Sequence, residues 1–147
     1  MDKTDIILLA AGYNKGSKKP CSLWSLGNGK SILDWQMHAF EMALPDSRVN
    51  IAVGYDYQRI INNYPHHIFR HISNWEKGGA LNSFLSIAYD YSLNTLVMYG
   101  DTVFHPETIA EFIGIKGDVI VAIDSAWKNR LSDRSQEDIE LAETLNI

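Results

Sequence analysis

The stretch Ile6–Leu23, with the sequence IILLAAGYNKGSKKPCSL, decides the fold that this protein is expected to have. Its first residues form an apolar run that is too short for a helix and ends in glycine, which is typical of a buried parallel strand. The loop Gly12–Lys19 follows, with two glycines and three lysines. Glycines allow a tight turn, and exposed backbone N–H groups suit phosphate oxygens. The loop is therefore either an anion-binding site or a solvated surface loop.

Apolar runs and helical patterns alternate along the rest of the chain. The predicted strands are residues 5–11, 49–54, 68–72, 95–99 and 119–123, and the predicted helices are residues 31–44, 57–64, 80–91, 106–113 and a last one that begins near residue 135. This alternation predicts an α/β fold, with a mostly parallel, Rossmann-like sheet between two layers of helices, in a single domain of residues 1–147. Such sheets bind ligands outside the carboxyl ends of their strands.

Composition and charge narrow the class of protein. Of the 147 residues, 46% are hydrophobic and 21% are charged, which is ordinary for a soluble globular domain. The formal net charge of −5 argues against binding to nucleic acid or to a membrane surface, because such proteins normally carry a basic field. Cys21 is the single cysteine, and the first apolar run is too short for a signal peptide or a membrane span. These features favour a cytoplasmic protein.

Two aspartates stand directly after predicted strands. Asp101 follows the strand 95–99, where a carboxylate can hold Mg²⁺ against substrate phosphates. Asp124 follows the strand 119–123 and could help to hold metal or substrate. For both residues a helix cap or a turn is the alternative. A sheet of this class can place the ends of its first and fourth strands side by side, so a polyphosphate would lie between the lysine loop and Asp101.

The remaining reactive side chains give weaker signals. The histidines have no spacing typical of metal ligands, so surface or packing roles are expected for His66, His67, His71 and His105. Cys21 has no partner base and is expected to be a small buried residue. Among the tryptophans, Trp75 and Trp127 are the candidates for the edge of a site. The sequence shows no nucleophile and base pair of the Ser-His-Asp kind.

Several motifs carry a family resemblance that runs over nearly the whole chain. They are Leu9-Ala10-Ala11-Gly12, Lys19-Pro20, Gly29-Lys30-Ser31, Val53-Gly54-Tyr55, Trp75–Ser83 and Tyr99-Gly100-Asp101. Together they resemble the start of the nucleotidyltransferases of the sugar-phosphate and phosphocholine type. The segment Val121–Trp127 with Arg130 resembles the cytidylyltransferases that act on phosphocholine or phosphonates in capsule or phosphonate biosynthesis. The resemblance implies the three-layer α/β/α fold of the nucleotide-diphospho-sugar transferases.

The resemblance also implies a reaction and a set of site residues. The phosphate or phosphonate of a small acceptor would attack the α-phosphorus of a nucleoside triphosphate, and pyrophosphate would leave. The resemblance to the cytidylyltransferases implies that this triphosphate is CTP. Asp101 would hold Mg²⁺, and Asp124 and Trp127 would contact the acceptor substrate. Of the two catalytic lysines, Lys15 would lie on the outgoing phosphates, and Lys19 would contact the α-phosphate or the acceptor. The nucleotide-binding residues would be Leu9, Ala10, Ala11, Gly12, Lys15, Lys77, Gly78, Ala80, Asn82 and Gly100. Catalysis would then depend on positioning and charge neutralisation.

The sequence departs from the family signature in three ways. Asn14 stands at the second signature glycine, and asparagine tolerates left-handed backbone. Lys15 stands at the signature arginine and keeps its charge but not its bidentate fork. Family members continue past Ile147 into an acceptor pocket and a second metal carboxylate, so the C-terminal part of the family fold is expected to be missing. Four interpretations stay open: an active enzyme, a truncated or inactive nucleotide-binding module, a homo-oligomer that completes its site, and an α/β domain with a structural or interaction role.

Overall fold

The chain divides into two compact units, Met1–Gly114 and Ile115–Ile147. This computed structural model describes residues 4–88, 94–130, 133–140, 142 and 144. The second unit carries two short helices among its described residues, α5 (Trp127–Arg130) and α6 (Gln136–Glu140), and α6 begins where the sequence predicts its last helix. No helix in the described ranges is both long and apolar enough to cross a lipid bilayer. The expectation of a single domain over residues 1–147 stays a prediction.

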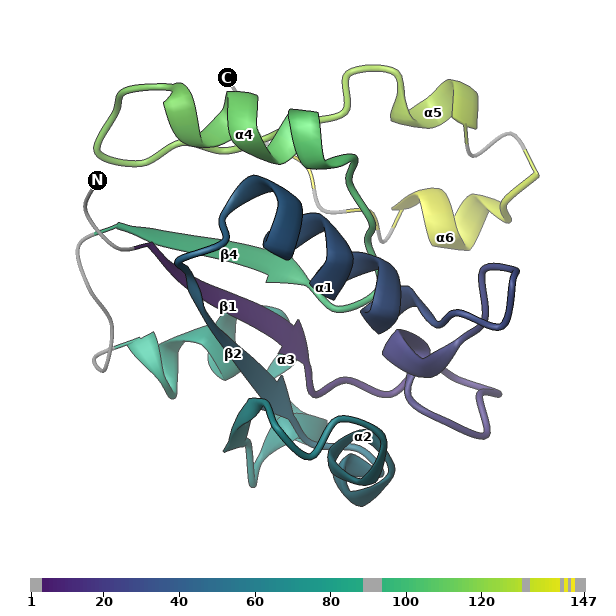
Figure 1. The fold of residues 1–147 in the computed structure, drawn as a ribbon. Coiled ribbons are helices and arrows are strands. Elements are labelled where there is room, and N and C mark those ends of the chain that lie inside the picture. The colour runs from purple at the N-terminus through teal and green to yellow at the C-terminus, as the bar shows by residue number, and fades with distance from the viewer. Residues whose placement is uncertain (1–3, 89–93, 131–132, 141, 143, 145–147) are drawn as a thin grey trace. The chain divides into compact units, whose positions relative to one another are not determined.

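A four-stranded, fully parallel sheet forms the centre of the first unit (Figure 1). Its strands are β1 (Asp5–Ala10), β2 (Arg48–Val53), β3 (Ile68–His71) and β4 (Thr95–Tyr99), in the order β3-β2-β1-β4. The register places Leu9 of β1 opposite Ala52 of β2 and Tyr99 of β4, so these three strands end at about the same level. The strand order reverses between β1 and β4, and parallel sheets of this class bind ligands at such a switch point.

Helices cover both faces of this sheet, as the sequence pattern predicts (Figure 1). One face is covered by α1 (Ile32–Ala43), α2 (Tyr57–Asn63) and α4 (Pro106–Gly114), and the other by α3 (Trp75–Leu85). Successive residues of β1 point alternately into the two cores, because side chains alternate along a strand. The first core includes Ile6, Leu8, Leu33, Phe40, Ile51, Ile60, Leu96, Met98 and Ile109, and the second consists of Ile7, Ala11, Ala52, Ile72 and Ile87.

The predicted helices occur with shifted ends. Ser31, the first residue of the predicted helix 31–44, caps α1: its Oγ accepts a hydrogen bond from the Asp34 N–H, and the Asp34 carboxylate accepts one from the Ser31 N–H at 2.7 Å. The helix predicted at residues 80–91 begins earlier, at Trp75, because a kink at Gly79 joins a first turn to the rest of α3. The helix α3 ends at Leu85, earlier than predicted. Residues 89–91 of the predicted helix lie outside the described residues.

One predicted strand is wrong. Residues 119–123 form no strand in the second unit, and Val119, Val121 and Ile123 are 86%, 59% and 55% exposed. An apolar run becomes a strand only where a neighbouring strand supplies hydrogen-bond partners for its backbone. None of the strands in the described part of the chain pairs with this run. The apolar pattern alone therefore misled the sequence prediction.

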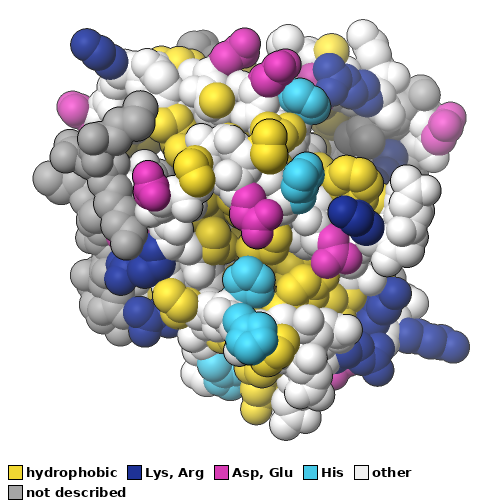
Figure 2. Space-filling model, viewed as in Figure 1, with side chains coloured by type: hydrophobic (Ala, Val, Ile, Leu, Met, Phe, Trp, Pro, Cys, Tyr) yellow, Lys and Arg dark blue, Asp and Glu magenta, His cyan; other side chains and the backbone are white. Residues whose placement is uncertain are grey.

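Histidine side chains gather over β2, β3 and α2 on the face that Figure 2 shows. The His71 ring packs against Tyr57, with ring centroids 4.6 Å apart, and the His67 ring lies 6.0 Å from that of Tyr64. Across the described ranges, no three His, Cys, Asp or Glu side chains are grouped so that they could hold a metal ion. The ring contacts agree with the surface or packing roles that the sequence predicts for these two histidines.

Candidate functional site

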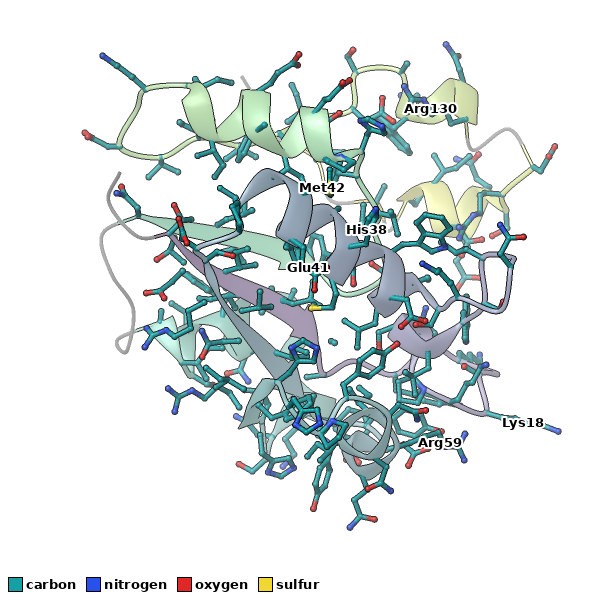
Figure 3. All side chains as sticks on the ribbon, viewed as in Figure 1. Lys18, His38, Glu41, Met42, Arg59 and Arg130 are labelled. Carbon is teal, nitrogen blue, oxygen red and sulfur yellow. The ribbon has the colours of Figure 1, made fainter. Side chains whose placement is uncertain are left out.

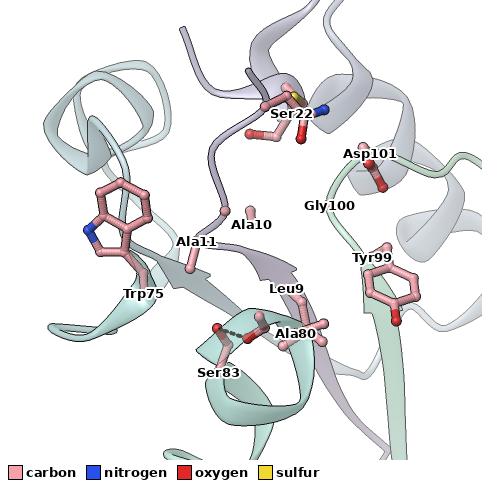
Figure 4. Close-up of a pocket in the computed structure, with 14 residues that line it drawn as sticks. Leu9, Ala10, Ala11, Ser22, Trp75, Ala80, Ser83, Tyr99, Gly100 and Asp101 are labelled. Atoms are coloured by element: carbon pink, nitrogen blue, oxygen red, sulfur yellow. Dashed lines mark hydrogen bonds between the residues drawn. The ribbon is translucent and has the colours of Figure 1, made fainter. Parts of the chain in front are cut away.

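A pocket of about 150 Å³ opens at the carboxyl ends of β1 and β4, at the switch point of the sheet (Figure 4). Its walls come from the end of β1 and the loop after it, from the short 3-10 helix η1 (Cys21–Leu23), from α3, and from the end of β4 with the turn after it. The site residues predicted from sequence that line it are Leu9, Ala10, Ala11, Gly12, Ala80, Gly100 and Asp101. Residues far apart in the sequence thus meet where the strand order predicts a ligand.

Glycine 100 allows the two strands to approach closely beside the pocket. A Cβ atom on Gly100 would lie 2.7 Å from the Cβ of Ala10 and 2.9 Å from the Leu9 carbonyl oxygen. The Gly100 N–H also donates a 2.8 Å hydrogen bond to that oxygen. A side chain at this position would push β4 away from β1, so only glycine fits here without a shift of the backbone.

The opposite wall is formed by the start of α3. Trp75 packs on Gly54, where an added Cβ would lie only 2.5 Å from the indole ring. The rings of Tyr13, Tyr55 and Trp75 form a chain of contacts, with centroids 4.7 Å and 5.7 Å apart. Gly79 has a φ of +59°, a backbone conformation that side chains disfavour. This kink lets the backbone of α3 turn at the pocket edge, where Gly79 and Ala80 line it.

The turn after β4 carries Asp101 and is held by a buried side chain from α1. Gln36 is 1% exposed, and its Nε2 donates hydrogen bonds to the carbonyl oxygens of Tyr99 (2.8 Å) and Thr102 (2.7 Å). Asp101 itself is exposed, and its Oδ1 accepts a hydrogen bond from the Thr102 hydroxyl at 3.3 Å. Gln36 was not among the site residues predicted from the sequence. The signal that could have identified it is the position of a polar residue on the apolar face of the predicted helix 31–44.

The lysine loop is fixed through its backbone, and its lysines do not line the pocket. Ser17 Oγ donates a hydrogen bond to the Lys19 carbonyl and accepts one from the indole N–H of Trp24 at 3.1 Å. The Arg59 guanidinium donates a 3.1 Å hydrogen bond to the Lys18 carbonyl. The Lys18 side chain points away from the surface (Figure 3). Lys19 is half-buried and Lys15 is exposed, and neither is among the described residues that form the pocket walls.

The other predicted nucleotide-binding residues lie on α3 without lining the pocket. They are Lys77, Gly78 and Asn82. Lys77 is exposed. Gly78 packs on Asn82, because a Cβ on the glycine would lie 2.2 Å from the Cβ of the asparagine. Their roles toward a nucleotide stay predictions.

Asp124 and Trp127 belong to the second unit. The Asp124 carboxylate accepts a 3.0 Å hydrogen bond from the Ala126 N–H and lies 3.4 Å from the Arg130 guanidinium. Trp127 begins α5, with the ammonium group of Lys128 5.6 Å from the centre of its ring. These contacts stabilise a turn and a short helix, and the predicted roles of both residues in binding an acceptor stay predictions.

Seven of the fourteen lining residues are not among the catalytic, nucleotide-binding, metal or substrate residues predicted from the sequence. These lining residues are Asn14, Cys21, Ser22, Trp75, Gly79, Ser83 and Tyr99. Trp75 was expected at a site edge, whereas Cys21 was expected to be buried and is instead half-buried at the pocket. Burial, and after it the negative charge of Asp101, raises the pKa of the Cys21 thiol. Asn14 lies in a loop and Tyr99 at the end of a strand, where periodicity gives no signal, whereas Ser83 lies inside α3.

Solved structures share this arrangement of strands and helices. A nucleotidyl transferase from Methanothermobacter matches with a TM-score of 0.64 and 12% sequence identity, over 77% of this chain and 57% of that one. The chain has the fold of the nucleotidyltransferases. Protein Rv0371C of Mycobacterium tuberculosis H37Rv, in a complex with manganese, matches with a TM-score of 0.57 and 15% identity, over 76% of this chain and 58% of that one.

A third similar structure is the CTP:phosphocholine cytidylyltransferase from Streptococcus pneumoniae. It matches with a TM-score of 0.56 and 18% identity, over 71% of this chain and 50% of that one. This chain therefore spans between 50% and 58% of the length of these three structures. No family model matches the sequence, and no curated protein matches it significantly.

The pocket offers one carboxylate to a divalent cation. Asp101 is exposed at its edge, and the described residues provide no second acidic side chain in the pocket wall. Hard cations such as Mg²⁺ take oxygen ligands and often combine one or two carboxylates with substrate phosphates and water. The donor set at Asp101 therefore fits a divalent ion that arrives with a polyphosphate, and it does not fit a metal held by the protein alone.

Proposed function

We propose that this chain binds a nucleoside triphosphate with Mg²⁺ and transfers its nucleotidyl group to a small acceptor that carries a phosphate or a phosphonate. The observation that carries the proposal is the pocket between β1 and β4. Its floor is made of the small residues Ala10, Ala11, Gly12 and Gly100, with Asp101 at its edge. Small residues let a ligand reach backbone N–H groups, which are the groups that suit phosphate oxygens.

The proposed reaction exchanges one phosphoanhydride bond for another. An oxygen of the acceptor phosphate or phosphonate bonds to the α-phosphorus of the triphosphate. The bond from the α-phosphorus to the bridging oxygen breaks, and pyrophosphate leaves with its electron pair. When bound, Mg²⁺ would neutralise charge on the phosphates. The chain would contribute the backbone of residues 9–12 as a cradle, the charges of Lys15 and Lys19 on the phosphates, and the Asp101 carboxylate as the metal ligand.

CTP and a phosphorylated acceptor are the first substrates to test. The Streptococcus pneumoniae structure is that of a CTP:phosphocholine cytidylyltransferase. The resemblance of the sequence to cytidylyltransferases implies CTP with either phosphocholine or a phosphonate as the acceptor. We therefore propose CMP as the transferred group, and we propose Asp124 and Trp127 as contacts of the acceptor.

Release of pyrophosphate tests the proposal. The assay contains the protein, Mg²⁺ and one of the four common nucleoside triphosphates, with a panel of phospho- and phosphono-acceptors that includes phosphocholine. CTP is expected to give acceptor-dependent pyrophosphate. If no nucleotide gives pyrophosphate and calorimetry detects no nucleotide binding, the proposal is wrong.

Two adjacent lysines give a matched pair of variants. Lys19→Ala and Lys18→Ala remove the same charge from the same loop, but the Lys18 side chain points away from the surface whereas Lys19 is half-buried (Figure 3). Loss of one charged phosphate contact typically costs about 1.5–3 kcal/mol. We therefore expect Lys19→Ala to weaken triphosphate binding by about 10- to 100-fold, and Lys18→Ala by less than about 3-fold. Equal effects of the two variants would show that the loop is a solvated surface.

A nucleotide-binding module without turnover is the second candidate. It is favoured by the described pocket wall, which offers a single carboxylate, that of Asp101, to a metal. This candidate predicts that calorimetry detects CTP with Mg²⁺ while no acceptor yields product. The two candidates share the same pocket and differ only in the release of pyrophosphate.

A further inference from the structure

We propose that Gln36 is a positioning residue that holds the Asp101 turn in the geometry that binds the metal and the triphosphate. The inference rests on the proposed function, since it names a residue that controls the same site. Gln36 comes from α1 and is nearly fully buried, and it is not one of the residues that line the pocket. It can therefore act on a ligand only through the backbone that it holds.

The hydrogen bonds of Gln36 leave its amide group a single orientation. Its Nε2 donates to two backbone carbonyls, those of Tyr99 and Thr102. An amide nitrogen has two hydrogens to donate, whereas an amide oxygen has none. A flipped amide would place Oε1 against both carbonyl oxygens. The turn therefore uses the whole donor capacity of this side chain.

The core does not explain the presence of an amide at this position. Gln36 Oε1 is buried and has no hydrogen-bond partner among the described residues. A buried acceptor without a partner lowers stability, and an apolar side chain of the same length would avoid that loss. The neighbouring residues on the same face of α1, Leu33, Met37 and Phe40, are apolar and buried. What the amide adds is its pair of bonds to the turn.

The two carbonyls that accept hydrogen bonds from Gln36 lie on either side of Gly100 and Asp101. The Tyr99 carbonyl precedes Gly100 and Asp101, and the Thr102 carbonyl follows them. The Gly100 N–H is bonded to β1 through the Leu9 carbonyl at 2.8 Å, while the Thr102 N–H reaches the Tyr99 carbonyl at 3.4 Å, a long hydrogen bond. The turn is thus fastened to β1 on one side and to α1 on the other, and the Asp101 side chain remains exposed to a ligand.

Loss of the two hydrogen bonds from Gln36 is expected to lower the affinity for the metal more than it lowers the stability of the folded chain. Removal of groups that orient a metal ligand typically lowers metal affinity by about 10- to 100-fold. We expect a loss in that range for Gln36→Met, which keeps the length of the side chain and removes both donors. Asn50→Leu is the matched control, because Asn50 is also a buried amide with 1% exposure, and its Nδ2 donates to the Arg48 carbonyl in β2, away from the turn.

Two measurements on the full chain test the inference. The first is the affinity of Mn²⁺, measured by electron paramagnetic resonance in the presence of CTP, at a temperature where each variant is folded. The second is hydrogen exchange of the backbone amides of residues 99–102 in the free protein. Gln36→Met should lower the affinity and speed the exchange, and Asn50→Leu should do neither. If Gln36→Met fails to fold, Gln36→Asn replaces it, because that amide is one methylene too short to reach both carbonyls.

The outcomes separate this inference from the proposed function. Unchanged exchange at residues 99–102 in Gln36→Met overturns the inference, whatever the wild-type protein binds. An equal loss of Mn²⁺ affinity in Gln36→Met and Asn50→Leu also overturns it, since a general loss of packing would then account for both. If the wild-type protein binds no Mn²⁺ with any nucleoside triphosphate, the proposed function fails, while faster exchange in Gln36→Met still supports the attachment of the turn to α1.

Discussion

Gly100→Ala is predicted to force β1 and β4 apart at the edge of the pocket. The new methyl carbon would lie 2.7 Å from Ala10 Cβ and 2.9 Å from Ala10 Cα. Carbon atoms pack best at about 3.5–4.0 Å, so the methyl group is roughly 1 Å too close. The atoms it meets belong to a buried strand and cannot swing aside as a long side chain could. Overpacking of this kind typically costs about 1–3 kcal/mol of the free energy of unfolding.

Thermal unfolding followed by circular dichroism measures this cost. For a chain of this length, 1–3 kcal/mol corresponds to a decrease in Tm of about 3–10 °C. Gly114→Ala is the control, because no atom lies within 4 Å of the Cβ position at the end of α4. That variant is expected to be neutral or slightly stabilising. If Gly100→Ala unfolds at the same temperature as Gly114→Ala, the close approach of the strands is not what requires glycine.

Two further predictions concern the pocket and the start of α1. Gly12→Ala should leave Tm unchanged, because no atom lies within 4 Å of its Cβ position. The same variant should weaken nucleotide binding in calorimetry, because Gly12 lines the pocket. A normal affinity would show that no ligand approaches Gly12. Burial alone would raise the pKa of Asp34, but hydrogen bonds from the Ser31 backbone, the Tyr64 hydroxyl and the Ser31 hydroxyl, with the charge of Lys30, lower it overall. The folded-state pKa then lies below the unfolded value, so Asp34 contributes stability that is complete above the unfolded pKa and is lost as the pH falls through the folded pKa. Urea unfolding between about pH 2 and 6 should show this loss in the wild-type protein and a smaller one in Asp34→Asn, and identical pH profiles would contradict the reasoning.

The centre of the fold could be predicted because its signals are local. The run that became β1 is apolar and short and ends in glycine, and Ser31 and Asp34 form the capping box that fixes the start of α1. Such features depend on residues a few positions apart, so one sequence is enough to show them. The parallel sheet then follows from the alternation of strands and helices, and the switch point follows from the strand order.

The rest depends on contacts that a sequence pattern does not contain. Gln36 bonds to carbonyls 63 and 66 residues away. The kink at Gly79 is a backbone conformation, and glycine permits it without requiring it. Residues 119–123 have the composition of a strand, but a strand forms only with a partner. The lysine loop was predicted from its charge, and charge alone does not say which lysines face a ligand.

The pocket wall is drawn from segments that are separated by up to about ninety residues along the chain. A ligand that contacts the end of β1, the start of α3 and the turn after β4 would therefore act as a cross-link between distant parts of the first unit. Because it binds the folded state alone, it would raise the free energy of unfolding by about 2.7 kcal/mol at a concentration of 100 times its Kd. That gain corresponds to a shift in Tm of roughly 5–10 °C. Nucleotides, metals and acceptors can thus be ranked by melting temperature before any product is known.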